Sequence, residues 1–344
     1  MGIQSHFISF HNKIKLSKTD ETYSEARKRD DSITDQVKEA FHDSGYPVID
    51  NFIQGSFSTD TAIVSLNDDI DIDRAIVIDN ENSPNDPVKP KQTVYQVLQD
   101  RGFKNAKVKK PCVTADYASE SLHIDIPVYR LRNGIHELAV GKTNSDENNR
   151  EWSVADPKGL KDWIKNNSQY GGSADRKQQQ FNRIVRYLKR WRDENFTNLV
   201  AKKVYSIGLT VMAKECFTPY FNNQGLPNDL EALKGTVSRI LGHGYFSNIG
   251  NNQYRVTVNL PVLPYRDVFD GSALDTATQF KNKLERLETK LIEAISEHRV
   301  VKQCEILNSM FGADFVVPAS DTSASTAQKK RYASAGAVGT SQGA

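Results

Sequence analysis

The pattern of apolar and polar residues predicts strands in the first half of the chain. Residues 48–53 form an apolar run that leads into a Gly-Ser pair, which is typical of a strand entering a turn. Residues 70–78 alternate Ile with Asp, so we expect a strand with one acidic face and one apolar face. Residues 112–117 and 122–129 also alternate around a short polar connection, which predicts a hairpin. Pro127 indicates that the second of these strands ends there or lies at a sheet edge.

Helical periodicity dominates the second half. Asp156 followed by Pro157 is typical of a helix N-terminus. Residues 174–195 carry one apolar stripe at helical spacing. We also expect a long, largely exposed helix at residues 17–44, begun by Ser17 or Thr19. The other expected elements are helices at 93–101, 202–217, 229–241 and 272–310 (the last as one helix or two), strands at 130–140 and 256–262, and loops at 80–90 and 143–149.

These elements predict an α+β protein with two lobes and a tail. Residues 1–150 are expected to form a lobe built on a mixed sheet, with flanking helices that include the long N-terminal one. Residues 155–315 are expected to form a helical lobe that closes a cleft, a usual place for a substrate. Residues 318–344 are rich in small and polar residues, and we expect a disordered tail there.

Composition narrows the class of protein. The chain has 344 residues, and its 45 Lys and Arg nearly balance its 43 Asp and Glu. This near-neutrality argues against a general nucleic-acid coat protein but leaves room for a local basic pocket. The basic run at residues 104–110 reads as solvated surface, with a phosphate-facing role as the alternative. The three cysteines, Cys112, Cys216 and Cys304, show neither a disulfide framework nor zinc spacing, so we expect reduced thiols.

Targeting signals are not visible. The N-terminus lacks a basic region followed by an apolar core, and no apolar run reaches the length of a membrane span. We therefore expect a soluble, cytoplasmic protein without a membrane partner.

The acidic strand carries the first candidate chemistry. Asp69, Asp71 and Asp73 would line one strand face, although Asp is a poor strand former. Two carboxylates about 5 Å apart repel by roughly 3 kcal/mol at an effective dielectric near 20. A bound divalent cation would turn this cost into coordination. The alternative is an amphipathic strand whose acidic face meets water.

A third carboxylate and a turn extend this site. Asp125 lies between two isoleucines of its strand and points away from their apolar face. With Asp71 and Asp73 it forms the set of carboxylates that two-metal phosphoryl transfer requires, and Mg²⁺, or Mn²⁺ in its place, is the expected cofactor. Asp69 remains an alternative to Asp73 as the partner of Asp71. Gly55 and Ser56 would offer free amides and a hydroxyl to a phosphate.

Four segments together resemble the cGAS/DncV-like nucleotidyltransferases, and more closely their bacterial members that make signals in anti-phage defence. The segments are QGSFSTDTAIVSLNDDIDIDRAIVI, SLHIDIPVY, RIVRYLKRWRDENF and YSIGLT. The resemblance spans roughly residues 15–315. The order of Gly-Ser, Asp-x-Asp and third Asp is shared by the wider polymerase-β-like superfamily, whereas HIDIP and RYLKRW narrow it to the bacterial branch.

The resemblance implies a polymerase-β-like nucleotidyltransferase lobe with a helical lobe. Nucleoside triphosphates (ATP, GTP or pyrimidine nucleotides) would be joined into a cyclic di- or oligonucleotide with release of pyrophosphate. Asp71, Asp73 and Asp125 match the family's metal-binding and catalytic carboxylates. The positions that match its nucleotide-binding residues are Gln54, Gly55, Ser56, Lys189 and Ser206. Without the resemblance, Lys189 is one of many surface lysines and Ser206 a helix cap.

The resemblance also bears on partners. The animal sensor of the family has a zinc-binding element that clamps DNA, and this chain lacks the corresponding His/Cys cluster, so we expect no nucleic-acid activator. Related operons encode a conjugation enzyme, and the tail ending GTSQGA would suit its active site. A linear oligonucleotide or tail-adding transferase and a non-catalytic nucleotide-binding module remain as alternatives.

Overall fold

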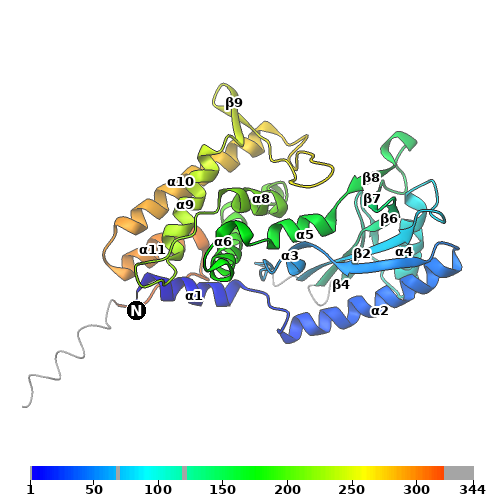
Figure 1. Ribbon diagram of the computed structural model, residues 1–344, viewed down its shortest axis with the longest axis horizontal. Coiled ribbons are helices and arrows are strands. Elements are labelled where there is room, and N and C mark those ends of the chain that lie inside the picture. The colour runs from blue at the N-terminus through cyan, green and yellow to red at the C-terminus, as the bar shows by residue number, and fades with distance from the viewer. Residues whose placement is uncertain (1, 67–69, 118–121, 321–344) are drawn as a thin grey trace, which may run out of the picture.

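A computed structural model describes residues 2–66, 70–117 and 122–320 of the chain. Asp69 lies outside the described residues, and so does most of the expected tail, from residue 321 on. Figure 1 shows an elongated molecule with a sheet and two long helices at one end and a group of helices at the other. The fold is α+β, with a mixed sheet and flanking helices, as the sequence predicts.

The strand β2 (Ile70–Asp79) lies at the centre of the sheet. It runs parallel to β5 (Leu122–Ile126) and β6 (Val128–Arg132), and antiparallel to β1 (Val48–Ile53). Pairing continues past Pro127, because the Ile76 amide donates to its carbonyl. The described residues give one sheet of eight strands, completed by β3 (Lys107–Val108), β4 (Val113–Tyr117), β7 (Ile135–Val140) and β8 (Glu151–Ala155).

Two sequence predictions for the sheet are confirmed, one is wrong and one strand was missed. β4 and β5 form the expected antiparallel hairpin, and β5 ends before Pro127. The strand expected at 130–140 is interrupted, because Asn133 and Gly134 both have positive φ and turn the chain between β6 and β7. β8 was not expected.

Helices α2 (Glu21–Asp43) and α4 (Val88–Asp100) pack side by side against the sheet (Figure 1). Val37 of α2 and Leu98 of α4 lie in one hydrophobic core with the isoleucines of β2. Asp20 is the residue before α2, so the expected start at Ser17 or Thr19 is wrong by one to three residues. α4 begins within the loop expected at 80–90.

The helical part is built around α6 (Ala174–Asn195). Its apolar stripe, including Phe181, Ile184 and Leu188, is fully buried. The expected segment at 272–310 is two helices in succession. The elements of this part are α5 (Pro157–Lys165), α7 (Asn198–Ala201), α8 (Ser206–Cys216), α9 (Asp229–Gly242), α10 (Leu274–Ser296), α11 (Val300–Phe311) and the hairpin of β9 (Phe246–Gly250) and β10 (Gln253–Val256).

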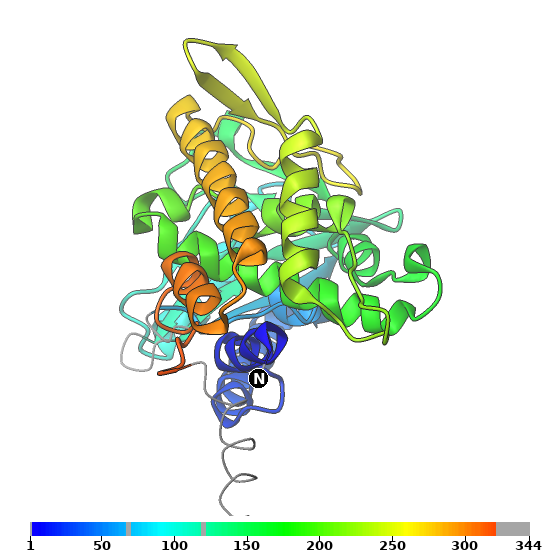
Figure 2. The same ribbon diagram turned by 90° about the vertical axis from the view of Figure 1, so that its left-hand side faces the viewer.

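The N-terminal helix α1 (Ile3–Ile14) packs with the helical part. Its residues Phe7, Phe10 and Ile14 lie in the same hydrophobic core as α6. Figure 2 shows α1 beneath α9 and α11. This differs from the expectation that residues 1–150 form one lobe, because the first helix joins the core of the second lobe.

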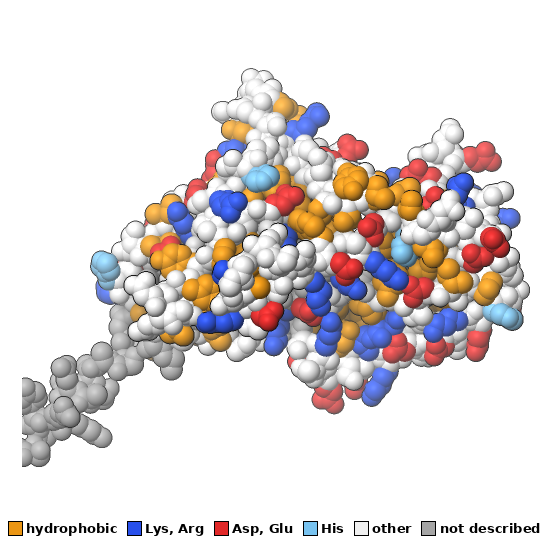
Figure 3. Space-filling model, in the orientation of Figure 1, with side chains coloured by type: hydrophobic (Ala, Val, Ile, Leu, Met, Phe, Trp, Pro, Cys, Tyr) orange, Lys and Arg blue, Asp and Glu red, His pale blue; other side chains and the backbone are white. Residues whose placement is uncertain are grey.

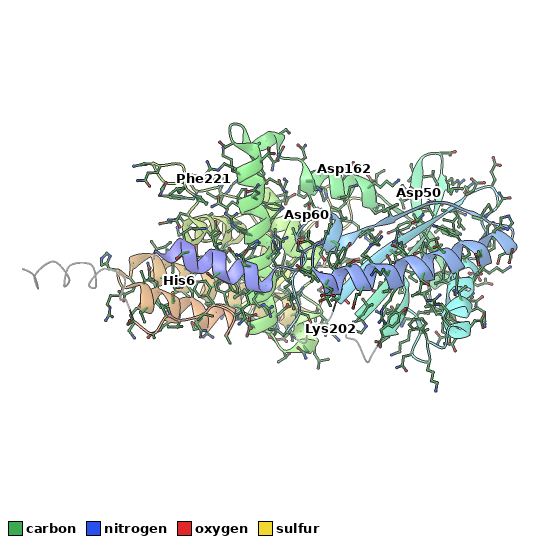
Figure 4. The ribbon with its side chains drawn as sticks, turned by 90° about the horizontal axis from the view of Figure 1, so that it is seen from below. His6, Asp50, Asp60, Asp162, Lys202 and Phe221 are labelled. Carbon is green, nitrogen blue, oxygen red and sulfur yellow. The ribbon has the colours of Figure 1, made fainter. Side chains whose placement is uncertain are left out.

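Helix α6 also holds the connector, residues 59–66, which follows the short helix α3 (Gly55–Ser58). Three cationic side chains of α6 donate to main-chain carbonyls of the connector: Arg186 to those of Asp60 and Ala62, Lys189 to that of Thr61, and Arg190 to that of Val64. The Asp60 carboxylate accepts from Lys18 and Lys165. Figure 4 places Asp60 where the two parts of the molecule meet.

Two expectations from composition concern thiols and membranes. All three cysteines are free and buried, as expected. Within the described ranges, the helices lack the combination of length and apolar character that crossing a membrane requires.

Candidate active site

The turn at Gly55 lies directly against the acidic strand. Gly55 has a φ of +65°, and a Cβ added there would lie 2.0 Å from Oδ2 of Asp73. Only glycine fits such an approach, because any side chain would displace the carboxylate. The amide of Gln54 donates to the Asp73 carbonyl at 2.9 Å, which fixes the backbones together. The chain therefore holds the Gly-Ser turn beside a carboxylate.

The three expected carboxylates belong to adjacent strands. Asp71 and Asp73 share one face of β2, and Asp73 is the register partner of Asp125 on β5. Burial, followed by the charges of Asp125 and Asp71, raises the pKa of Asp73 to about 7. The charges of Lys189 and Lys109 oppose this increase. The strands thus concentrate negative charge where a cation would lower the energy.

A cavity of about 490 Å³ brings these residues together with helices α5, α6 and α8. Seven of the eight expected site residues line it: Gly55, Ser56, Asp71, Asp73, Asp125, Lys189 and Ser206. Gln54 is the exception. Its side-chain oxygen accepts a hydrogen bond from the Tyr129 hydroxyl at 3.0 Å, and it is not among the lining residues.

Lys189 reaches the cavity from α6 and is only 4% exposed. Its ammonium donates to the Thr61 carbonyl at 3.0 Å and lies 3.3 Å from the Thr61 hydroxyl. Burial, followed by the charges of Arg192 and Arg186, lowers the pKa of Lys189 to about 7. An anion in the cavity would favour the protonated form.

Ser206 is the first residue of α8, and its hydroxyl accepts a hydrogen bond from Arg192 at 2.6 Å. The N-cap is Tyr205, so Ser206 is the first helical residue and not the helix cap. Tyr187 and Trp191, which flank Lys189 in sequence, are fully buried core residues. The aromatic neighbours of Lys189 therefore do not face the cavity.

Three cationic side chains of the cavity wall were not expected as site residues: Lys109, Lys161 and Arg192. Lys109 belongs to the basic run at 104–110, for which a phosphate-facing role was the alternative to solvated surface. Arg192 follows Lys189 by three residues, which places both on one side of a helix. Figure 3 shows Lys and Arg side chains gathered in the middle of the view, where α5 and the start of the sheet lie in Figure 1.

The carboxylate oxygens of the site suit a divalent cation, although the side chains do not form a complete coordination shell. In the part of the chain that the structure describes, no group of three or more His, Cys, Asp or Glu is placed to hold a metal ion. Oδ1 of Asp125 accepts from the Thr114 hydroxyl and lies 3.3 Å from Nζ of Lys109. Mg²⁺ commonly takes only one or two carboxylates together with water and substrate phosphates, and Asp71 and Asp73 provide such a pair. Asp69 lies outside the described residues, so its competition with Asp73 stays open.

Sequence comparisons give two matches. Residues 1–167 match the domain family described as Second Messenger Oligonucleotide or Dinucleotide Synthetase. A cyclic GMP-AMP synthase from Escherichia albertii is 27% identical over 218 residues, which are 60% of this chain. The matched stretch is 45% of that relative, so the chain spans about half of its length.

Solved structures extend the likeness to nearly the whole chain. DncV from Vibrio cholerae, with 3′-deoxy GTP bound, superposes with a TM-score of 0.68 at 17% identity and covers 88% of this chain and 92% of its own. The CD-NTase CdnG from Bradyrhizobium diazoefficiens, in complex with GTP, gives 0.66 at 15% identity and covers 91% and 96%. These structures share the polymerase-β-like fold with this chain, including its helical part.

Proposed function

We propose that the chain is a cGAS/DncV-like nucleotidyltransferase that joins nucleoside triphosphates into a cyclic di- or oligonucleotide. The domain match over residues 1–167 and the fold shared with DncV support this proposal. Pyrophosphate leaves at each step. The bound GTP and 3′-deoxy GTP of the two structural relatives support triphosphates as the substrate class.

One observation carries this proposal. The Gly55–Ser56 turn lies against Asp73 in a cavity that Lys189 and Ser206 enter from the helical part. An anion-binding turn next to carboxylates suits a triphosphate accompanied by a cation. A cavity of about 490 Å³ falls in the size range of small-ligand sites.

In this mechanism the carboxylates would hold the cation, and the other residues would bind the phosphates. Asp71, Asp73 and Asp125 would hold Mg²⁺, or Mn²⁺ in its place, which supplies charge to the triphosphate and lowers the pKa of the attacking hydroxyl. Ser56 would donate to the phosphates. Lys189 would exchange its hydrogen bond to Thr61 for one to a phosphate oxygen, and the anion would stabilise its charged form.

The setting of the reaction is part of the proposal. We expect synthesis of the cyclic product without a nucleic-acid activator, a role in anti-phage defence and a cytoplasmic location. Activity that appears only after duplex DNA is added would contradict the first expectation. The C-terminus is proposed as a conjugation site, although residues 342–344 lie outside the described part. Unchanged conjugation after deletion of these residues would refute that role.

The test is synthesis by the purified chain. Radiolabelled ATP, GTP, CTP and UTP with Mg²⁺ or Mn²⁺ should give a phosphatase-resistant product whose mass matches a cyclic nucleotide. Asp71→Ala and Asp73→Ala should each reduce pyrophosphate release by on the order of a hundredfold or more, because the cation loses a ligand. Asp79→Ala, at the far end of β2, is the matched control and should retain activity.

Each alternative has its own outcome in this assay. Phosphatase-sensitive products would favour a linear or tail-adding transferase. Nucleotide binding without pyrophosphate release under any condition would favour a non-catalytic module.

A further inference from the structure

Lys109 places a positive charge inside the acid cluster. Its Nζ lies 3.3 Å from Oδ1 of Asp125, and its side chain is 48% exposed. It lines the same cavity as Asp71 and Asp73, and its charge opposes the increase in the pKa of Asp73. The Thr114 hydroxyl donates to the same oxygen. Oδ1 of Asp125 therefore accepts from two donors, Lys109 and Thr114.

A second lysine fixes the backbone from which Lys109 extends. Lys91 of α4 is completely buried. Its ammonium donates to the carbonyls of Lys109, Lys110 and Gly141 at 2.6, 2.8 and 2.5 Å. Burying an ammonium is costly unless its donors are satisfied, and these three carbonyls satisfy them. The position of the turn that carries Lys109 is thus set from within the core.

The negative charges of the acid cluster explain why a cation is needed in the cavity. Neighbouring carboxylates repel one another when no cation lies between them. Lys109 offsets part of this repulsion, and it does so at an oxygen that a divalent cation would also use. An ammonium and a divalent cation cannot occupy one carboxylate oxygen in the same direction, so the two compete.

We propose that Lys109 is the internal counter-cation of the acid cluster: it neutralises Asp125 in the metal-free protein and is displaced when a divalent cation binds. Lys109 is then a positioning residue that sets the metal affinity of the site. The inference rests on the metal role in the proposed function, and it adds a competitor that belongs to the chain itself.

The experiment measures metal binding by the full-length chain without nucleotide. Titration calorimetry with Mn²⁺ compares the wild type with Lys109→Gln and Lys109→Arg. An exposed ion pair is typically worth 0.2–1 kcal/mol, so Lys109→Gln should bind Mn²⁺ about 1.4- to fivefold more tightly. Lys109→Arg keeps the charge and should bind as the wild type does. Lys104→Gln removes a charge from the same basic run outside the cavity wall and should also leave the affinity unchanged.

A second readout avoids metal altogether. In the presence of a chelator, Lys109→Gln should melt at a lower temperature than Lys104→Gln, because the carboxylates repel more strongly without their counter-cation. Lys91→Met should change Mn²⁺ affinity in the same direction as Lys109→Gln, since it releases the turn while retaining the Lys109 ammonium. Circular dichroism establishes that each variant is folded.

The outcomes separate this inference from the proposed function. If Lys109→Gln binds Mn²⁺ no more tightly than the wild type while the wild type forms cyclic product, only the role of Lys109 is overturned. If the wild type neither binds Mn²⁺ nor forms product, both are overturned.

Discussion

Gly55 combines two constraints at one residue. Its φ is positive, and the position that a Cβ would occupy is already taken by the Asp73 carboxylate. Many turns need the first property, whereas only a turn that touches the acid cluster needs the second. The two effects can be separated by comparing glycines that share the first property alone.

We expect Gly55→Ala to abolish nucleotide incorporation. The new Cβ would meet Oδ2 of Asp73 at 2.0 Å and push the carboxylate away. Gly45→Ala is the matched control, because Gly45 has a φ of +84° with no atom within 4 Å of an added Cβ. Each variant should lose about 1–2 kcal/mol of stability from the backbone. Product formation and urea unfolding measure both effects, and equal activity losses in the two variants would contradict the expectation.

Seven of the eight candidate residues named from the sequence line one cavity, but the sequence did not predict their contacts. Spacing on a strand put Asp71 and Asp73 on one face, and the family motifs added Lys189 and Ser206. Gln54 was included because it adjoins Gly55, but its side chain turns to Tyr129. Lys109 was open to two readings, because a run of lysines does not reveal which one a turn directs into a cavity.

At the scale of elements, a buried ion pair ties α2 to β2. Arg74 follows Asp73 and points to the opposite side of the strand, where its guanidinium binds Asp30 and Asp31 of α2. The Asp30 side chain is 1% exposed, and that of Asp31 is 56% exposed. The helix thereby anchors the strand that carries the acid cluster.

This pair gives a prediction with an adjacent control. Asp30→Ala should lower the free energy of unfolding by about 3 kcal/mol, because it removes the buried partner of a buried guanidinium. Asp31→Ala removes a solvent-exposed partner of the same guanidinium and should cost less than about 1 kcal/mol. Urea denaturation compares the two. Similar losses would mean that burial does not decide the strength of this pair.

Elements with strong periodicity were predictable, and those set by tertiary packing were less so. The alternation in β2 and the apolar stripe of α6 identified both elements. α1 was not expected from the sequence, because its apolar pattern is short. The structure shows that its Phe7 and Phe10 pack in the same core as α6. The turn at Asn133 and Gly134 was overlooked within the strand expected at 130–140.

At the scale of the whole molecule, α1 brings an uncharged histidine into the helical core. Burial, and then the charges of Arg186, Arg183 and Lys15, lower the pKa of His11 to about 3. Within the described part of the chain its Nδ1 is buried without a hydrogen-bond partner. The folded protein therefore resists protonation of this ring.

We expect His11 to make the protein less stable in mild acid. The pKa of His11 is lower in the folded state than the ordinary histidine value of 6.5, so the unfolded chain binds the proton first as pH falls. The free energy of unfolding should fall between pH 6.5 and 5 by about 1 kcal/mol through His11, half the full linkage value because the ring is partly solvated. Urea unfolding at both pH values measures this.

Two glutamine variants isolate the contribution of His11 to the pH dependence of stability. His11→Gln should lose less stability than the wild type over this pH interval. His42→Gln, which replaces a side chain that is 80% exposed, should behave as the wild type does. An unchanged pH dependence in His11→Gln would show that this ring is protonated equally well in both states.

The hydrogen bonds from α6 to the connector determine which mutations the connector can tolerate. Arg186, Lys189 and Arg190 bind its carbonyls, which every amino acid provides. These bonds depend on the spacing of the carbonyls and not on the identity of the side chains, although the buried Thr61 and Ala62 are also constrained by packing. Inserting or deleting a single residue would shift every carbonyl away from its donor. The length of this stretch should therefore be constrained more strongly than its composition.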